Sequence, residues 1–188
     1  MLEKKYSPEQ IDAFVAEAQQ GKTEAFEQLY NSFVDQIYRY TYYRTGREDA
    51  LDITENVFLK VWENIRSYKV GRKYFSSWIY RIAHNAVVDH YRTNKEVAEL
   101  SFDVADNKRA ADPVRIASGV IGGENLMKAI SKLNKKHQQV IVLKYINELE
   151  NREIAMIMRK SEGSLRILKF RALKALRQIM EDMNERNK

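Results

Sequence analysis

The chain has no cysteine among its 188 residues, so it offers neither a disulfide framework nor a thiolate metal site. A chain without cysteine suits a reducing compartment, and we expect this protein in the cytoplasm. No apolar run approaches the ~18 residues that a membrane span requires, and the first six residues do not resemble a secretory signal. We therefore expect no membrane insertion.

Glycine and proline are scarce, with seven and two residues, whereas Leu, Ile, Ala, Glu, Lys and Arg are abundant. This composition is typical of an all-α protein. Apolar residues recur at helical spacing in eight segments. These segments lie between Ser7 and Gly21 and at 23–44, 47–65, 75–92, 124–133, 136–146, 151–158 and 162–183.

The helical period is lost in residues 95–123, which contain Asp112-Pro113 and three glycines. We interpret this segment as a flexible linker. The sequence therefore predicts two small helical domains, residues 1–94 and 124–188, joined by the linker at 95–123.

Charge alternates in sign along the chain. The net charge is −5 for residues 7–67, +5 for 68–95, −3 for 96–124 and +8 for 125–188. Two basic regions separated by acidic ones indicate two contacts with nucleic acid and at least one further partner, which is itself basic.

The most informative motif is residues 151–177, a short helix, a tight polar turn and a longer basic helix. This order is typical of a helix-turn-helix, whose second helix enters the DNA major groove. The segment from Arg152 to Arg177 holds eight Lys or Arg and two Glu, which suits a phosphate surface. Residues 161–164 also offer an N-cap hydroxyl and free backbone N–H groups to a phosphate. The expected duplex-binding residues are Arg152, Ser161, Glu162, Gly163, Ser164, Arg166, Ile167, Phe170, Arg171 and Lys174.

Ile167 and Phe170 are unusual on a basic face. They are explained by contacts with thymine methyl groups or with a protein partner, or by packing of the helix on the linker.

On a helical wheel, residues 47–65 separate an apolar half from an acidic half. The expected core residues are Ala50, Ile53, Val57, Phe58, Val61, Trp62 and Ile65. The opposite face carries Asp49, Asp52, Glu55, Asn56, Leu59 and Glu63. The ordinary interpretation is a solvated face with one stray leucine. The alternative is a docking surface for a basic helix, with Leu59 as its apolar anchor.

The helix predicted at 75–92 combines a buried stripe with a strip of aromatic, basic and amide side chains, next to a basic loop at 68–74. Aromatic rings stack on unpaired bases, cations hold the backbone, and an amide can pair with a base edge. The expected single-strand-binding residues are Lys69, Arg72, Lys73, Tyr74, Trp78, Arg81, Asn85, Asp89 and Arg92. The alternative is that the aromatic residues simply complete the core. His84 and His90 are six residues apart and have no acidic cluster beside them, so we assign them no metal or catalytic role.

Taken in order, these motifs resemble the extracytoplasmic-function (group IV) sigma factors of bacterial RNA polymerase. Residues 24–30 (Glu-Ala-Phe-Glu-Gln-Leu-Tyr) and 47–62 are similar to that family's regions 2.1 and 2.2. Residues 75–92, with the block Trp-Ile-Tyr-Arg-Ile-Ala-His-Asn-Ala, are similar to regions 2.3 and 2.4, and residues 132–176 to region 4.

The resemblance implies an adaptor with neither catalysis nor a cofactor, in the bacterial cytoplasm. The acidic face would bind core RNA polymerase at the β′ clamp helices, and the β flap is a second expected contact. The strip with Asn85 would melt the −10 element of promoter DNA and capture a flipped base, and the basic helix would read the −35 element. An anti-sigma factor is a further expected partner, and we hypothesise that the acidic first domain shields the basic second one in the free protein.

Two details depart from the family's usual pattern. Glu55-Asn56 stands where the family usually has Gln-Glu. Arg159 and Lys160 stand where the turn before the recognition helix usually has a glycine and an apolar residue, so this turn lacks its glycine.

Two rival functions remain open at this point. A dimeric helix-turn-helix regulator that acts without polymerase would need a dimerisation helix and no affinity for single strands. A helical hydrolase or nuclease would need carboxylates that converge around a cavity, whereas the acids of residues 47–65 lie on one outward face.

Overall fold

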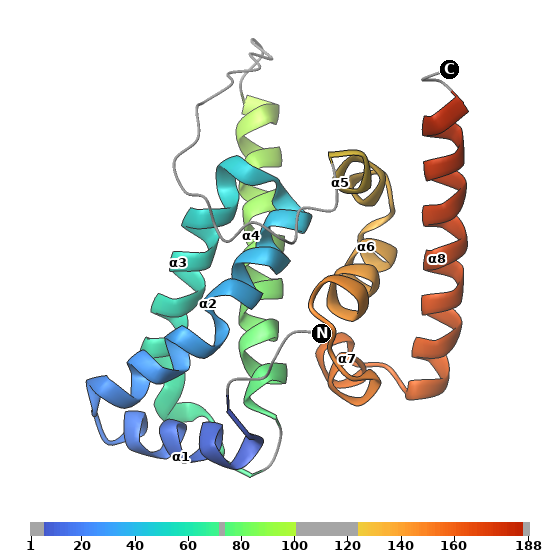
Figure 1. Cartoon of the computed structure of the whole chain (residues 1–188). Helices are drawn as coiled ribbons and strands as arrows, with labels where there is room; N and C mark the ends of the chain where they lie inside the picture. Colours follow the sequence, from blue (N-terminus) through green and yellow to red (C-terminus); the bar gives the residue numbers. More distant parts are fainter. Residues whose placement is uncertain (1–5, 72–73, 101–123, 186–188) are drawn as a thin grey trace.

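The computed structural model describes residues 6–71, 74–100 and 124–185, and within these ranges the protein is all-α without a strand (Figure 1). This confirms the predicted fold class. The helices are α1 (Pro8–Gln19), α2 (Thr23–Thr45), α3 (Arg47–Asn64), α4 (Phe75–Leu100), α5 (Glu124–Ser131), α6 (Lys135–Ile141), α7 (Asn151–Met158) and α8 (Glu162–Glu185). A 3-10 turn, η1 (Ile65–Ser67), follows α3, and a π-helical turn, η2 (Val142–Ile146), follows α6.

Local signals set the limits of the first helices. The Ser7 Oγ accepts a hydrogen bond from the Gln10 backbone N–H at 3.3 Å, and the Gln10 side chain accepts one from the Ser7 N–H at 2.8 Å. This reciprocal pair caps α1, which begins at Pro8. Gly21 (φ 91°) and Gly46 (φ 95°) occupy positive-φ positions after α1 and α2, where a side chain would be strained.

Helix α4 is longer than predicted. It runs to Leu100 rather than Arg92, and so it includes the first six residues of the predicted linker. Residues 93–100 contain no glycine or proline, so helical hydrogen bonding continues where the apolar period has already been lost. The rest of the predicted linker, residues 101–123, lies outside the described residues.

Helices α1–α4 form the N-terminal bundle, in which α2, α3 and α4 pack around one another. The predicted core face of α3 is confirmed except at Trp62, which is 43% exposed and packs edge-on against Phe26 with ring centroids 4.8 Å apart. The buried Thr54 is a polar addition to this face: its hydroxyl lies 2.9 Å from that of Thr41 and donates to the Ala50 carbonyl.

Helices α5–α8 form the C-terminal bundle. The turn between α7 and α8 requires a left-handed residue, and Arg159 supplies it with φ 52° and ψ 49°. The Lys160 N–H then donates to the Ala155 carbonyl at 2.9 Å and closes the end of α7. The missing glycine therefore leaves the geometry of the turn intact, and an arginine adopts the conformation that a glycine usually takes.

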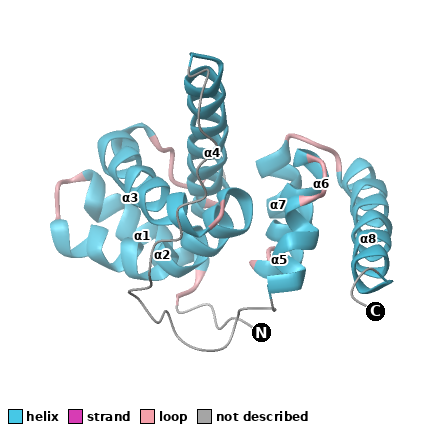
Figure 2. Ribbon diagram, turned by 90° about the horizontal axis from the view of Figure 1, so that it is seen from above, coloured by secondary structure: helices cyan, strands magenta, loops and turns pink. Residues whose placement is uncertain are grey.

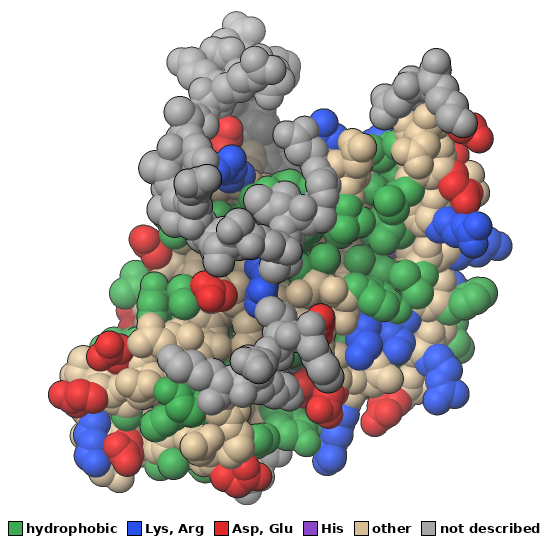
Figure 3. All heavy atoms as spheres, viewed as in Figure 1, with side chains coloured by type: hydrophobic (Ala, Val, Ile, Leu, Met, Phe, Trp, Pro, Cys, Tyr) green, Lys and Arg blue, Asp and Glu red, His purple; other side chains and the backbone are tan. Residues whose placement is uncertain are grey.

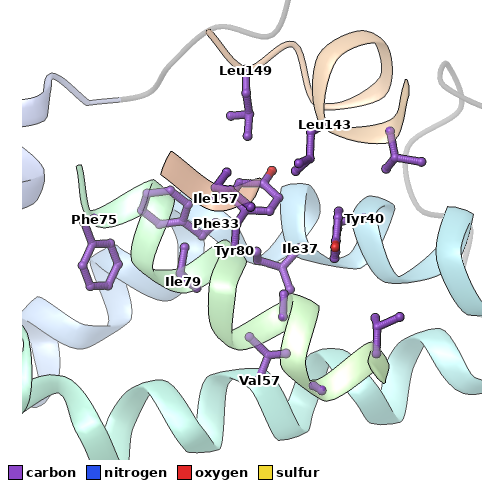
Figure 4. Packing of buried hydrophobic residues seen from close by; sticks show 14 of the residues in the cluster. Phe33, Ile37, Tyr40, Val57, Phe75, Ile79, Tyr80, Leu143, Leu149 and Ile157 are labelled. Carbon is purple, nitrogen blue, oxygen red and sulfur yellow. The ribbon is translucent and has the colours of Figure 1, made fainter. Parts of the chain in front are cut away.

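The two bundles share a buried core. Leu143, Leu149 and Ile157 of the C-terminal bundle lie against α2 and α4, close to Tyr80 (Figure 4). Polar contacts flank this apolar seam: Gln138 Nε2 donates to the Tyr43 carbonyl at 3.1 Å, and Ser76 Oγ donates to Glu153 at 2.5 Å. Helix α8 lies on the far side of α5–α7 from the N-terminal bundle (Figures 1 and 2). The two groups of helices therefore meet through α2 and α4 on one side and α5, α6, η2 and α7 on the other, and α8 keeps one face free.

Candidate functional site

The acidic face of α3 points to solvent. Asp52, Glu55, Asn56 and Glu63 are exposed, and Leu59 among them is 64% exposed. Asp49 differs, because its Oδ2 lies 3.2 Å from His90 Nε2 of α4. The structure therefore brings five of the six predicted docking residues to one open surface and turns the sixth toward α4.

This surface is more apolar than the sequence indicated. Besides Leu59, it exposes Leu51 to 52% and Trp62 to 43%, while the neighbouring α2 exposes Tyr30, whose ring packs against Phe58. The helical wheel placed Trp62 with the core, because its angular position borders both faces. Leu51 and Leu59 are eight residues apart, a spacing that brings two side chains to the same side of a helix. This spacing was the sequence signal for a second apolar position beside the acids. Large side chains exposed together are typical of a surface that binds a protein.

Four of the predicted single-strand-binding residues line a cleft of about 960 Å³ between α4 and the C-terminal bundle. These residues are Trp78, Arg81, Asn85 and Asp89. Lys69 is exposed in the loop before α4, and Arg92 is exposed one turn beyond Asp89, with its Nη2 3.7 Å from Asp89 Oδ1. Arg72 and Lys73 lie outside the described residues.

Trp78 belongs to an aromatic cluster and also borders the cleft. Its ring centroid lies 5.3 Å from that of Tyr68 and 5.4 Å from that of Phe75. Tyr68 and Phe75 are buried, and burial raises the pKa of the Tyr68 hydroxyl to about 12. Trp78 is only half-buried. Tyr68 therefore completes the core, whereas Trp78 keeps a part of its ring accessible and stays a predicted single-strand-binding residue.

Tyr74 stands apart from the cleft. It is half-buried beside a cavity of about 420 Å³, and the Arg152 guanidinium lies 5.9 Å from its ring centroid. A residue predicted to touch the single strand is thus in contact with a residue predicted to touch the duplex. The two predicted sites meet here only because the bundles pack together.

Asp89 is held by two cations. Lys60 Nζ of α3 lies 3.9 Å from its Oδ2, in addition to the Arg92 contact with Oδ1. Asn85, one turn earlier, is exposed. Its amide is therefore accessible for a base edge.

His84 lies where the bundles meet. Its Nδ1 is 3.4 Å from the Tyr40 hydroxyl and 3.2 Å from Gln139 Nε2 of α6. Burial, and then the nearby Arg44 guanidinium, hold the pKa of His84 below its usual value. Because it contacts Tyr40 of α2 and Gln139 of α6, His84 helps to pack the two bundles together.

The helix-turn-helix has the predicted limits, with α7 at Asn151–Met158 and α8 starting at Glu162. Ser161 caps α8, since its Oγ accepts the Ser164 N–H at 3.2 Å. All ten predicted duplex-binding residues are exposed, Phe170 to 69% and Ile167 to 56%. Figure 3 shows basic and apolar side chains along the outer edge of α8, with acidic ones at its C-terminal end.

The recognition face of α8 is uncovered, because the N-terminal bundle contacts the opposite side of the C-terminal one. We hypothesised that the acidic first domain shields the basic second one; the packing leaves the face of α8 open and turns toward the first domain a different basic part of the second, which includes Lys135, Lys136, Arg159 and Lys160. The residues that the packing does partly enclose are those of α4 that line the cleft. No helix in the described ranges is long and apolar enough to cross a membrane.

Two family models match the chain, Sigma-70 region 2 at residues 29–97 and Sigma-70 region 4 at residues 123–176. The sequence is 32% identical to the ECF RNA polymerase sigma factor SigW of Bacillus subtilis over 180 residues, which cover 90% of this chain and 96% of SigW. It is 30% identical to the ECF RNA polymerase sigma factor BldN of Streptomyces coelicolor over 173 residues, or 89% of this chain and 65% of BldN.

Two solved structures share the fold. CnrH in complex with the cytosolic domain of CnrY matches with a TM-score of 0.70 and 20% identity, covering 92% of this chain and 98% of CnrH. The sigma factor RpoE of Bartonella quintana, in complex with the anti-sigma factor NepR, matches with a TM-score of 0.70 and 18% identity, covering 85% and 98%.

Proposed function

The chain belongs to the extracytoplasmic-function family of sigma factors, and we propose that it joins bacterial core RNA polymerase in the cytoplasm and directs it to promoters. The observation that carries this proposal is the presence of three distinct surfaces on one chain. They are the acidic and apolar face of α3, the strip of α4 with Trp78 and Asn85, and the basic outer face of α8.

The face of α3 suits the β′ clamp helices. Glu55, Asn56 and Leu59 are exposed side by side on one helix, so charge selects a basic partner and the leucine supplies buried area. The exposed Leu51 and Trp62 enlarge this apolar area. Asp49 contributes less, because His90 already engages its carboxylate.

The strip of α4 suits the unpaired −10 strand. Trp78 offers a stacking surface, the exposed Asn85 offers an amide for a captured base, and Lys69 and Arg92 lie near the strip as cations for the backbone. Unstacking each base costs a few kcal/mol, and these contacts offset that cost.

The outer face of α8 suits the −35 duplex. Arg166, Arg171 and Lys174 neutralise phosphates, and Ile167 and Phe170 are free to meet thymine methyl groups or the β flap. The capped start of α8 at Ser161 presents backbone N–H groups to a phosphate.

We further propose that residues 1–94 and 124–188 act as separate readers joined by the linker at 95–123. Two weak DNA contacts tethered to one enzyme act as one strong contact, because binding of the first reader raises the effective concentration of the second near its DNA site. Because the strip of α4 forms one wall of the cleft and the C-terminal bundle forms the other, we expect the two bundles to move apart when the −10 strand binds. The proposed role is that of an adaptor without catalysis, and we expect an anti-sigma factor to control it.

A binding experiment separates this function from a dimeric regulator. Size-exclusion chromatography of the protein with purified core polymerase should show co-elution, and the protein alone should elute as a monomer. A dimer that ignores core polymerase and binds only duplex DNA would support the regulator instead.

A further inference from the structure

The cleft between the two bundles is strongly cationic. Arg44, Lys60 and Arg81 line it from the N-terminal bundle, against one acid, Asp89. Lys60 and Asp89 lie 3.9 Å apart, so the acid is already engaged, and it also contacts Arg92. The remaining cations of this wall thus lack a carboxylate partner among the described residues.

The opposite wall repeats this charge. Lys135 and Lys136 of α6 and Arg159 and Lys160 of the turn after α7 line the cleft, and no acid of the C-terminal bundle does so. Lys135 Nζ lies 3.3 Å from the centroid of the Tyr91 ring of α4, so this lysine reaches across to the other bundle. Cations from two separate sequence regions therefore face one cleft that is open to solvent, and their mutual repulsion opposes the packing of the bundles.

Among these cations, Arg44 gives the strongest evidence that the cleft binds an anion. Arg44 is only 3% exposed, and its Nε has no hydrogen-bond partner in the described part of the chain. Among the described residues its guanidinium contacts only neutral groups of Tyr40: Nη1 lies 3.4 Å from the hydroxyl, and Cζ lies 5.6 Å from the ring centroid. A buried guanidinium without a counter-ion is costly, and a buried cation is normally paired. An anion in the cleft would supply a counter-ion to this guanidinium.

We propose that this cleft binds a small polyphosphorylated molecule. Its volume of about 960 Å³ is that of a site for a ligand of nucleotide size, and arginine and lysine side chains are the usual partners of phosphate groups. The bound phosphates offset the repulsion between the two walls, so the ligand bridges Arg44 and Arg81 on one side with Lys136 and Lys160 on the other. Neither the docking of α3 nor the duplex reading of α8 requires this site.

The ligand has a consequence for the −10 contact, and this consequence alone depends on the proposed function. Trp78 and Asn85 border the same cleft. A ligand that holds the bundles together there competes with the promoter strand and keeps the free protein closed.

The test uses the full chain and inorganic tripolyphosphate as the probe. The protein has two tryptophans, of which Trp78 borders the cleft and Trp62 lies on α3, so the W62F variant reports on the cleft alone. We expect a saturable change in Trp78 emission at constant ionic strength, with one site per chain by calorimetry. In the same background, Lys136→Gln with Lys160→Gln should weaken binding by about tenfold or more, because two charge-assisted contacts are lost.

The matched control removes the same charge elsewhere. Lys22→Gln with Lys132→Gln alters two exposed lysines that do not line the cleft, and it should leave the affinity unchanged. Equal weakening in both double variants, or no saturable binding by calorimetry, would overturn the proposal. A single-stranded hexanucleotide serves as the second arm: if it binds through Lys136 and Lys160 while tripolyphosphate does not, the cleft is a strand groove and the proposal fails. Co-elution with core polymerase, measured separately, reports on the proposed function and not on this site.

Discussion

At the scale of single residues, Asn85 carries the most specific assignment. It is exposed on α4 between Trp78 and Asp89, and it lines the cleft.

Asn85→Ala should leave binding to core polymerase unchanged and abolish or strongly reduce open complexes. Loss of a base-edge contact costs about 1–3 kcal/mol, or roughly tenfold to a hundredfold in open-complex formation. Permanganate footprinting of the −10 region measures this step. Asn94→Ala, on the same helix but outside the cleft, is the matched control, and intact open complexes in the Asn85 variant would remove it from strand capture.

Leu59→Asp should weaken association with core polymerase. The leucine is 64% exposed in the free protein, and burying such a side chain on docking contributes about 1.5–3 kcal/mol, which an aspartate forfeits. Fluorescence anisotropy with labelled protein gives the dissociation constant. Val70→Asp introduces the same charge at an exposed apolar residue before α4, and a similar loss in that variant would mean that charge alone weakens docking.

At the scale of helices, short-range signals account for most of what the sequence could predict. Ser7-Pro8, Gly46 and the Ser161 cap each act within four residues, so their consequences are readable from the chain. The continuation of α4 to Leu100 was missed, because a helix that loses its apolar period has no sequence mark of its end. Trp62 was misplaced for a related reason: its angle on the wheel borders both faces of α3, and only the position of α2 decides its exposure.

The turn between α7 and α8 gives a test at the same scale. Arg159 occupies the left-handed region, which costs a non-glycine residue about 1–2 kcal/mol. Arg159→Gly should therefore stabilise the protein by about 1 kcal/mol. Urea unfolding followed by circular dichroism measures the change. Arg159→Ala keeps the strain and should show no such gain, and a glycine variant no more stable than the alanine variant would contradict the strained turn.

At the scale of the whole molecule, the sequence led us to hypothesise a contact between the two domains, but not the residues that form it. Leu143, Leu149 and Ile157 look in the sequence like the core of a domain of their own, and nothing local shows that they also meet α2 and α4. The same long-range contact explains why the cleft escaped prediction, since its cations come from α2, α3, α4, α6 and the turn after α7.

His84 makes this packing sensitive to pH. It contacts Tyr40 and Gln139, and the cations Arg44 from α2 and Lys135 from α6 line the cleft beside it. Because its folded pKa is lowered, the unfolded chain binds the proton more tightly. The stabilising contribution of neutral His84 is therefore complete above pH 6.5, which is the usual pKa of histidine in an unfolded chain. The free energy of unfolding should decrease as the pH falls below that value.

Urea unfolding at a series of pH values from 7.5 to about 5.5 measures this dependence. His84→Gln should flatten it, whereas His90→Gln, which removes a histidine from the other side of α4, should leave it in place. An identical pH dependence in the His84 variant and the unaltered protein would show that the contact between the bundles does not respond to this proton.

The central claim is that one chain docks on core polymerase and reads a promoter at two places. Run-off transcription with purified core polymerase and a promoter library tests it most directly. The account predicts transcripts from a subset of templates that share a −35 and a −10 sequence, and only when this protein is added. Transcription no greater than that of core polymerase alone, on every template, would contradict it.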